Sequence, residues 1–334
     1  MDFMAASAAP IQHWRMKSVF QQPSGDRPVM ALLLLLTGVF AIAFQDSLVK
    51  LMSSHTSFWQ FQVLRSLGNF SFVTILAFFS GGIGLLIPRN WRPVYLRAGI
   101  LLVCMFFFFS GAPYLSVAQM ASGLYTYPLF ISLLAIPILG ERVGRWRIFA
   151  LLLGAIGAAF ILSPWDDDFS LLQVLPILAG LFYAANIITI RKACRNESPL
   201  ALAFAAAITF IIAGTIGISL LTLFPLSAEL RTSMPFVAIG WPELTLLVAA
   251  FALFASVLNL SANICISRAY QTADASWLAP VDFSYLIFAA FWSQVLFDQW
   301  PTSNAIIGMT LIGSAGIITA WRERLVAKHK RLSS

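Results

Sequence analysis

"GLYTYPLFISLLAIPILGERVGRWRIFALLLGAIGAAFIL", residues 123–162, has a second version near the end of the chain, "WLAPVDFSYLIFAAFWSQVLFDQWPTSNAIIGMTLIGSAGIIT", residues 277–319. Tyr127 and Tyr285 occupy the same place in the two stretches, and two glycines spaced three residues apart follow near the end of each. The same order of residue types at the same spacing indicates an internal repeat. This repeat decides the fold.

The repeat extends towards the N-terminus of each half. "GVFAIAFQDSLVK", residues 38–50, aligns with "GLFYAANIITIRK", residues 180–192, and both stretches begin with glycine and end with lysine. The distance between matched residues grows along the chain, so the second half contains an insertion. We place the extra residues in 225–242, the longest connection between hydrophobic segments.

The composition is that of a polytopic membrane protein. Hydrophobic residues make up 59% of the 334 residues and charged residues only 10%, against about a quarter charged in soluble domains. Spans of about 20 residues cross a hydrocarbon core about 30 Å thick, and as helices they satisfy their own backbone groups. The sequence predicts ten such helices: Val29–Met52, Ser57–Phe79, Tyr95–Val117, Met120–Leu139, Trp146–Ser163, Ser170–Ala193, Pro199–Phe224, Glu243–Ala269, Ala273–Phe297 and Thr302–Trp321.

Each half therefore holds five spans, and because five is odd, the second half enters the membrane in the opposite orientation. The expected fold is an all-α integral membrane protein of ten transmembrane helices in two inverted five-helix repeats. The expected units are a cytosolic N-terminal tail (1–28), repeat 1 (29–164), repeat 2 (165–321) and a basic cytosolic tail (322–334). Paired inverted halves around a central site are typical of secondary transporters.

Basic residues set the predicted orientation. They collect in every second loop and at both ends of the chain, whereas the loops on the other side hold only Lys50 and Arg231 together with the acidic run 166–168. Because basic loops stay in the cytoplasm, both termini are expected there, in a multi-pass protein of the plasma membrane, which is the inner membrane in a Gram-negative cell. The formal charge of +7 is read as this topology signal, and no nucleic-acid partner is expected.

Residues for catalysis, metal binding or cofactor binding are not grouped in this sequence. The three histidines lie outside the predicted spans, and the cysteines Cys104, Cys194 and Cys265 do not have metal or redox spacing. A phosphate-binding loop of the GxxxxGK[ST] kind is also missing. No cofactor is expected, and neither an intramembrane enzyme nor a channel or protein scaffold is favoured. The N-terminal residues do not have the pattern of a cleaved signal peptide.

The matched residues resemble the drug/metabolite transporter superfamily, in particular proteins built from two EamA domains. The supporting marks are Lys50 in the first span, Arg65 in the second, "LGER" (139–142) after the fourth, and the glycine-spaced fifth and tenth spans. In the second copy "FDQW" (297–300) stands where a "GE" pair is common in the family. The resemblance implies a ten-span fold and transport of small metabolites, often export, with uptake of nucleosides, vitamins or cofactors in some relatives.

Ionisable residues inside the membrane cost on the order of 3 kcal/mol by insertion scales, so each needs a reason. Asp46 and Arg65 lie at similar depths on adjacent spans and can form an ion pair, which is either a static brace or part of a transport site. Lys50 lies one turn from Asp46 and competes for the same carboxylate or reaches to the interface. Asp282 and Asp46 lack an acidic partner in the repeat, since they align with Leu124 and Ile188.

Further polar and aromatic side chains recur three or four residues apart on several spans. Stripes on separate helices favour a shared polar cavity, although interhelical hydrogen bonds explain a single stripe equally well. The glycines Gly154, Gly157, Gly313 and Gly316 are expected to serve close helix packing. The candidate substrate-binding or coupling residues are Asp46, Lys50, Arg65, Asn69, Tyr125, Asn186, Asn259, Asn263, Trp277, Asp282 and Tyr285.

The favoured function is secondary active transport of a small organic metabolite by alternating access, with proton coupling and with export slightly favoured. Uptake of a vitamin, nucleoside or cofactor-like compound is the alternative. The two carboxylates at different depths, Asp46 and Asp282, are candidates for proton exchange or for static structural roles. The expected partners are the substrate, the lipid bilayer and protons, and the protein is expected to be a monomer or homodimer.

Overall fold

Ten apolar helical segments form the part of the chain that the computed structural model describes, residues 28–140, 145–163, 165, 170–272, 278 and 281–332. No strand occurs in these residues. Seven segments are long and apolar enough to span a membrane, and three are shorter apolar helices. The predicted all-α membrane fold is therefore confirmed, whereas the predicted N-terminal tail lies outside the described residues.

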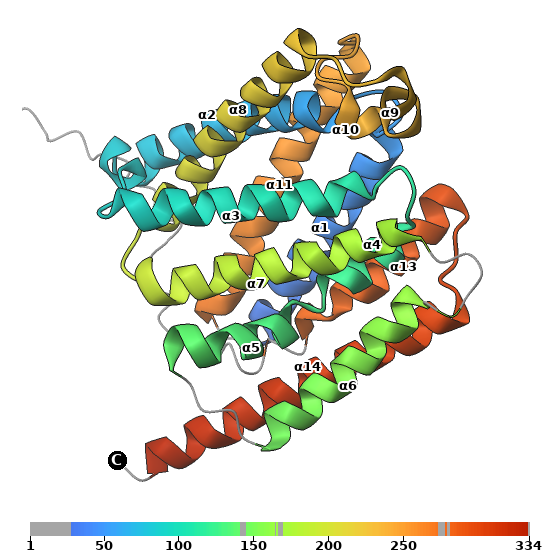
Figure 1. Cartoon of the computed structure of the whole chain (residues 1–334). Helices are drawn as coiled ribbons and strands as arrows, with labels where there is room; N and C mark the ends of the chain where they lie inside the picture. Colours follow the sequence, from blue (N-terminus) through green and yellow to red (C-terminus); the bar gives the residue numbers. More distant parts are fainter. Residues whose placement is uncertain are drawn as a thin grey trace, which may run out of the picture.

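The helices follow the predicted spans closely in most places (Figure 1). The first half consists of α1 (Pro28–Met52), α2 (Phe58–Ser80), α3 (Trp91–Ser110), α4 (Val117–Leu124), α5 (Tyr127–Leu139) and α6 (Arg145–Leu162), with a short 3-10 turn η1 (Ile83–Leu86). The second half consists of η2 (Leu171–Val174), α7 (Leu175–Ala193), α8 (Pro199–Leu223), α9 (Ala228–Ser233), α10 (Pro235–Ala238), α11 (Leu246–Thr272), α13 (Ser284–Phe297) and α14 (Ser303–Leu332).

The fourth span is not the single helix that was predicted, because α4 and α5 are separated at Tyr125 and Thr126. Pro128 is the cause: its ring collides with the carbonyl four residues earlier, and it has no N–H to continue the helical bonds. The Thr126 hydroxyl donates to the Gly123 carbonyl at 2.7 Å and satisfies one of the acceptors that the break exposes. Ser116 and Gln119 cap the start of α4 by bonding to each other's backbone N–H.

The ninth span is interrupted as well. Val281 and Asp282 are helical, Phe283 forms a turn, and α13 begins at Ser284. The backbone N–H of Leu286 donates to the Phe283 carbonyl at 3.1 Å, three residues back rather than four. The two interruptions lie within about one residue of equivalent positions in the repeat, so each half contains a broken helix at the same place.

The helices α3 and α14 differ from the bounds predicted for the third and tenth spans. The third begins at Trp91 and ends at Ser110, where Tyr95–Val117 was predicted, because a turn with Pro113 follows Gly111 and proline cannot extend the helix. The tenth continues to Leu332, so most of the predicted basic tail extends α14.

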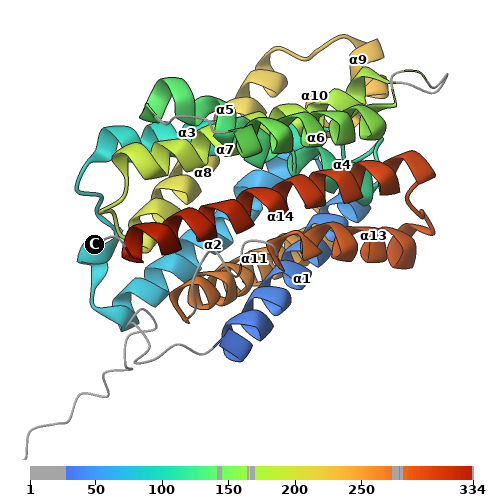
Figure 2. The same cartoon turned by 90° about the horizontal axis from the view of Figure 1, so that it is seen from below.

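Helix contacts repeat between the two halves. α1 packs on α11 as α7 packs on α3, and α1 packs on α13 as α7 packs on α5. α2 packs on α8 and α6 packs on α14, so these helices contact their own counterparts, and α4 of the fourth span packs on α13 of the ninth. A pseudo-twofold axis between the halves produces this pattern, and an odd number of spans per half makes the repeats inverted. Figures 1 and 2 show the α6–α14 pair lying along one side of the bundle.

The ends of α5 and α13 show the repeat at the level of single hydrogen bonds. Gly140 ends α5 in the left-handed conformation, with its N–H bonded to the carbonyls of Ala135 and Ile136. Asp298 ends α13 in the same conformation, with its N–H bonded to Ser293 and Gln294 at the matched positions. The aspartate of "FDQW" therefore ends its helix in the same left-handed backbone conformation as the glycine of "LGER". Glu141 lies outside the described residues.

Close packing is confirmed for three of the four repeat glycines. A Cβ on Gly157 would lie 2.9 Å from the carbonyl oxygen of Gly308, where α6 crosses α14. Gly154 packs on Leu129, and Gly316 packs on the ring of Phe283. In the described part of the chain, no atom outside the local helix backbone lies within 4 Å of a Cβ placed on Gly313, so the packing prediction is wrong for this residue.

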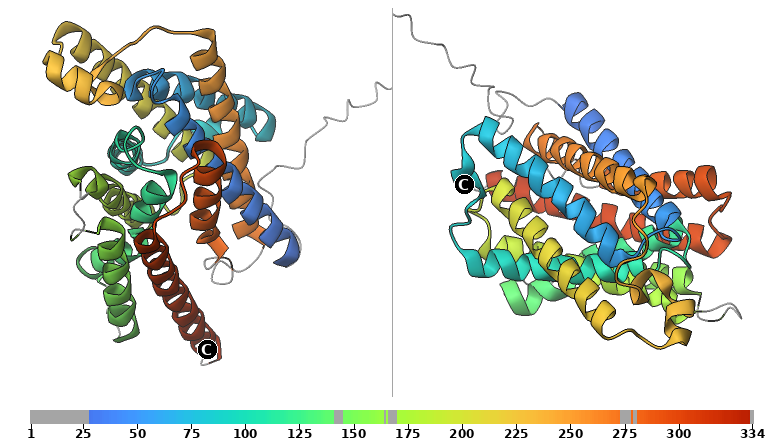
Figure 3. Two further views of the ribbon diagram at one scale, coloured as in Figure 1. Left: turned by 90° about the vertical axis from the view of Figure 1, so that its right-hand side faces the viewer. Right: turned by 90° about the horizontal axis from the view of Figure 1, so that it is seen from above.

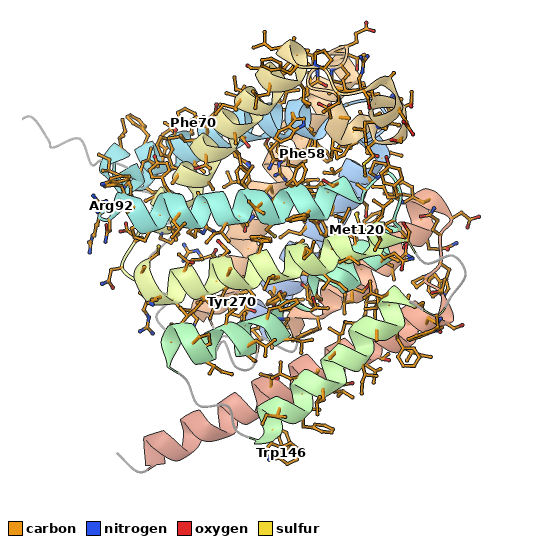
Figure 4. The ribbon with its side chains drawn as sticks, viewed as in Figure 1. Phe58, Phe70, Arg92, Met120, Trp146 and Tyr270 are labelled. Carbon is orange, nitrogen blue, oxygen red and sulfur yellow. The ribbon has the colours of Figure 1, made fainter. Side chains whose placement is uncertain are left out.

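The two ends of the bundle differ in their connections. Figure 4 labels Phe58 at the start of α2 and Arg92 at the start of α3, which lie at opposite ends. The end that contains Arg92 also contains the basic C-terminal part of α7 and the end of α14 (Figure 1). At the other end, the predicted insertion forms α9 and α10, which lie beside the start of α2 (Figure 3).

Candidate functional site

Tyr285, near the start of α13, donates a hydrogen bond of 2.6 Å to Oδ2 of Asp46 on α1. Both side chains are buried, with 3% of Tyr285 and 6% of Asp46 exposed. The other oxygen of the carboxylate, Oδ1, accepts a bond of 3.2 Å from the Gln45 amide. A carboxylate inside the bundle is therefore held by two donors from protein side chains, which offsets part of the cost of burying it.

A stack of two tyrosines joins Asp46 to the second carboxylate. The rings of Tyr125 and Tyr285 are almost parallel, at an interplanar angle of 10° and a centroid distance of 5.0 Å. The hydroxyl of Tyr125 donates to the backbone carbonyl of Asp282 at 3.1 Å, and the hydroxyl of Tyr127 lies 3.3 Å from Oδ2 of the same residue. We call Asp46, Asp282, Tyr125, Tyr127 and Tyr285 the tyrosine–aspartate cluster.

The two helix breaks create this cluster. In a continuous helix the Asp282 carbonyl would accept from the N–H of Leu286, but that N–H bonds to Phe283. The Asp282 carbonyl is left free and accepts from Tyr125, the residue at the other break. Because unsatisfied backbone groups are costly inside a membrane, non-helical backbone occurs there where it is covered by protein or lines a cavity. Breaks that face each other are a recurring construction of transport sites.

Close approach of α7 to the first break depends on a glycine. A Cβ at Gly180 would lie 2.8 Å from the Thr126 hydroxyl and 2.9 Å from the Leu124 carbonyl. Tyr183, one turn further along α7, packs edge-on against Tyr127 at 5.0 Å between ring centroids. Gly180 thus places another tyrosine against the cluster.

Asn259 of α11 is linked to the cluster through a residue that was not predicted. Its amide donates to Oε1 of Gln45 at 3.0 Å, and Gln45 in turn donates to Asp46. Gln45 is 1% exposed. Gln45 could have been selected from the sequence, because it is a polar residue in an apolar span directly before Asp46. Its contact with Asn259 on α11 could not be predicted from the sequence.

Asp46 and Arg65 do not form the expected direct ion pair. Among the described residues, no carboxylate oxygen lies within 4.0 Å of an Arg65 nitrogen. Nη2 of Arg65 donates to Gln62 at 2.9 Å, and the guanidinium lies 5.6 Å and 5.7 Å from the ring centroids of Phe61 and Phe109. Their charges act on each other over a longer distance. The expectation fails because Tyr285 and Gln45 occupy the carboxylate.

Lys50 does not compete for Asp46 either. Its ammonium group donates to the backbone carbonyl of Leu115, between α3 and α4, and lies 5.1 Å from the ring centroid of Phe297. These contacts tie the end of α1 to its neighbours. Lys50 is thereby separate from the tyrosine–aspartate cluster.

The remaining predicted residues fall into different places. Asn186 on α7 is 3% exposed, and its Oδ1 lacks a protein partner among the described residues, as does Oδ1 of Asn69 on α2. Asn263 is exposed on α11 and donates to the carbonyl of Asn259 on its own helix, which separates it from the cluster. Trp277 lies outside the described residues.

Metal-binding groups of three or more His, Cys, Asp or Glu side chains do not occur in the described part of the chain. The three cysteines are free thiols, with Cys104 and Cys194 buried. The chemistry available at the cluster is therefore hydrogen bonding to hydroxyl and carboxylate groups, stacking on aromatic rings, and protonation of two carboxylates.

Comparison with known proteins agrees with this architecture. The model of the EamA-like transporter family matches residues 29–163. A solved crystal structure superposes with a TM-score of 0.54 over 88% of this chain and 98% of its own, at 20% sequence identity. At that identity the superposition shows that the fold is shared.

Characterised relatives are transporters. A riboflavin transporter of Vibrio cholerae is 29% identical over 63% of this chain and 65% of its own length, just under two thirds of that protein. A riboflavin transporter of Rhizobium johnstonii is 28% identical over 79% of this chain and 80% of its own. The pseudopaline exporter CntI of Pseudomonas aeruginosa is 24% identical over 69% and 75%.

These relatives are carriers of small molecules and not enzymes, and the apolar helices make the present chain a multi-pass membrane protein. The family model covers the first half, and the contacts of the second half repeat those of the first. Residues 29–163 of this chain are therefore similar to the EamA-like transporter family.

Proposed function

We propose that this protein is a secondary transporter that moves a small planar organic molecule of the vitamin class across the bacterial inner membrane by alternating access. Riboflavin is the first substrate to test. The observation that carries the proposal is the tyrosine–aspartate cluster, in which stacked aromatic rings and two carboxylates meet at two broken helices. Riboflavin transporters among the relatives support this substrate class.

The chemistry of the cluster supports a planar substrate with hydroxyl groups. Tyrosine rings bind planar rings by offset stacking, worth about 0.5–1.5 kcal/mol for each pair beyond the buried area. Carboxylates and tyrosine hydroxyls bind sugar-like hydroxyls by hydrogen bonds. The Tyr125 and Tyr285 rings stack on each other at 5.0 Å. Access of a substrate ring to either inner face therefore requires the halves to separate, which alternating access provides.

Both termini are placed in the cytoplasm in this proposal, because the basic ends of α3, α7 and α14 share one side of the bundle. A proton gradient is the proposed driving force, and Asp46 and Asp282 are the groups that exchange protons. A buried carboxylate that gains or loses a hydrogen-bond donor during transport changes its proton affinity, which couples the two events.

Uptake of radiolabelled riboflavin tests the proposal in a bacterial riboflavin auxotroph that lacks its own riboflavin transporter. Cells expressing this protein should accumulate riboflavin with saturation, above cells with an empty vector. A protonophore should reduce the accumulation, and Asp282→Asn should remove the protonophore sensitivity. Preloaded cells measure export in the same strain. Absence of riboflavin movement in both directions, with the protein present in the membrane, would overturn the proposed substrate.

A further inference from the structure

One face of α2 carries four polar side chains with buried atoms that have no partner among the described residues. The atoms are Nε2 of Gln62, Nε of Arg65, Oγ of Ser66 and Oδ1 of Asn69. Spacings of three, four and seven residues place these side chains on one side of a helix. Gln62 and Ser66 are 0% exposed and Arg65 is 4% exposed. We call these four side chains the α2 polar face.

Polar side chains at the start of α2, in contrast, have partners. At the start of α2, Ser57 donates to the carbonyl of Gly240 and Gln60 donates to the carbonyl of Pro242, at 2.7 and 2.9 Å. Leaving a buried polar group unsatisfied costs about 1–3 kcal/mol, and more for a charged group. Four such groups together indicate a surface whose partners arrive with a ligand.

The polarity of the face defines the ligand group. Nε2 of Gln62 and Nε of Arg65 are donors only, the hydroxyl of Ser66 can donate as well, and Oδ1 of Asn69, one turn further, is the acceptor of the face. Arg65 adds a positive charge that no described carboxylate approaches within 4.0 Å. Donors beside a positive charge bind acceptor oxygens, as found on carbonyl, carboxylate and sulfonate groups.

The α2 polar face and the tyrosine–aspartate cluster are joined through α11. Asn259 of α11 donates to Gln45 at 3.0 Å, and Gln45 donates to Asp46 of the cluster at 3.2 Å. α2 and α1 both pack on α11, where Ser256 bonds to the Arg65 carbonyl at 2.8 Å. One ligand near Asp46 can therefore reach both groups.

We propose that the α2 polar face is the part of the transport site that binds the oxygen-bearing end of the substrate, through acceptor oxygens, while the tyrosines bind its ring. This inference rests on the proposed function as a carrier, and it does not depend on the substrate being riboflavin. It adds Gln62 and Ser66 to the candidate binding residues Arg65 and Asn69.

Cysteine accessibility in membranes tests this face without a known substrate. Ser66→Cys is made in a variant whose three cysteines are replaced, and it is treated with sulfonate and trimethylammonium methanethiosulfonate reagents. Relative to their intrinsic thiol rates, the sulfonate reagent should react at least tenfold faster. Adding Arg65→Gln should remove that preference. Asn69→Cys repeats the measurement if Ser66→Cys does not fold.

Ser71→Cys is the matched control, because Ser71 is exposed on α2 and bonds only to its own helix, through the Leu67 carbonyl. Its reactivity should not depend on Arg65. Equal relative rates for the two reagents at positions 66 and 69, or no reaction with either, would overturn the inference. Added riboflavin should also slow the reaction at position 66; an unchanged rate with riboflavin, with the charge preference retained, would contradict only the proposed substrate.

Discussion

The hydroxyl of Tyr285 donates a 2.6 Å hydrogen bond to Asp46, and this bond joins a residue that the two halves share to one that they do not. Tyr127, the repeat partner of Tyr285, approaches the other unmatched carboxylate, Asp282, at 3.3 Å. The repeat position of Asp46 in the second half is Ile188, which has no group to accept a hydroxyl. Symmetric tyrosines thus orient asymmetric carboxylates, and the asymmetry defines the chemistry of the site.

Removing the Tyr285 hydroxyl should impair transport more than it impairs folding. Tyr285→Phe keeps the ring that stacks on Tyr125 but deletes a hydrogen bond to a buried charge, worth about 1.5–3 kcal/mol. We expect transport kcat/KM to fall at least tenfold in an initial-rate uptake assay, with normal levels in the membrane. Tyr95→Phe, at an exposed position on α3, is the control. Wild-type kinetics for Tyr285→Phe would contradict the role of the bond.

Exchanging the charges of Asp46 and Arg65 should not restore activity. The two side chains have different partners, Tyr285 for Asp46 and Gln62 for Arg65, and the exchange would break both bonds. Uptake by the double variant Asp46→Arg/Arg65→Asp should be as low as uptake by either single variant. Recovery to half of the wild-type rate would show that the two residues act as a direct ion pair.

The crossing of α6 and α14 should tolerate no side chain at Gly157. A Cβ there would meet the Gly308 carbonyl at 2.9 Å, and overpacking of this kind costs about 1–3 kcal/mol. Gly157→Val should lower the thermal midpoint of the detergent-solubilised protein. Gly313→Ala on α14 is the control, because it has open space and should leave the midpoint unchanged or higher. Equal midpoints for both variants would contradict the packing of this crossing.

Three side chains at the start of α2 hold the segment that contains α9 and α10. Ser57, Trp59 and Gln60 donate to the carbonyls of Gly240, Val237 and Pro242. Ser57→Ala combined with Gln60→Ala should accelerate hydrogen–deuterium exchange in residues 234–242. Ser71→Ala, on the same helix, should not. An unchanged exchange rate in the double variant would show that other contacts hold this segment.

The spans could be predicted because hydrophobic length is a local property of the sequence. α1 (Pro28–Met52) and α8 (Pro199–Leu223) agree within one residue with the bounds predicted for the first and seventh spans. The break between α4 and α5 has a local signal in Pro128, but proline in a membrane helix also occurs with a simple kink. The structure was needed to show that this break faces the second one at Phe283, because Tyr125 bonds to the Asp282 carbonyl there.

The candidate site was only partly predictable. Asp46, Asp282, Tyr125 and Tyr285 could be selected because polar residues inside a membrane need a reason, and the structure brings them together. The choice of partner could not be predicted. Depth along the spans pointed to Arg65 as the partner of Asp46, but α13 packs against α1 and brings Tyr285 to the carboxylate.

Counterflow in proteoliposomes tests the central claim most directly. Purified protein is reconstituted into vesicles loaded with unlabelled riboflavin, and radiolabelled riboflavin is added outside. A carrier should show transient accumulation of label above equilibrium, with saturation, and Tyr125→Ala should reduce it because the stack with Tyr285 is lost. Linear flux without overshoot, or no flux at all with correctly inserted protein, would contradict the account.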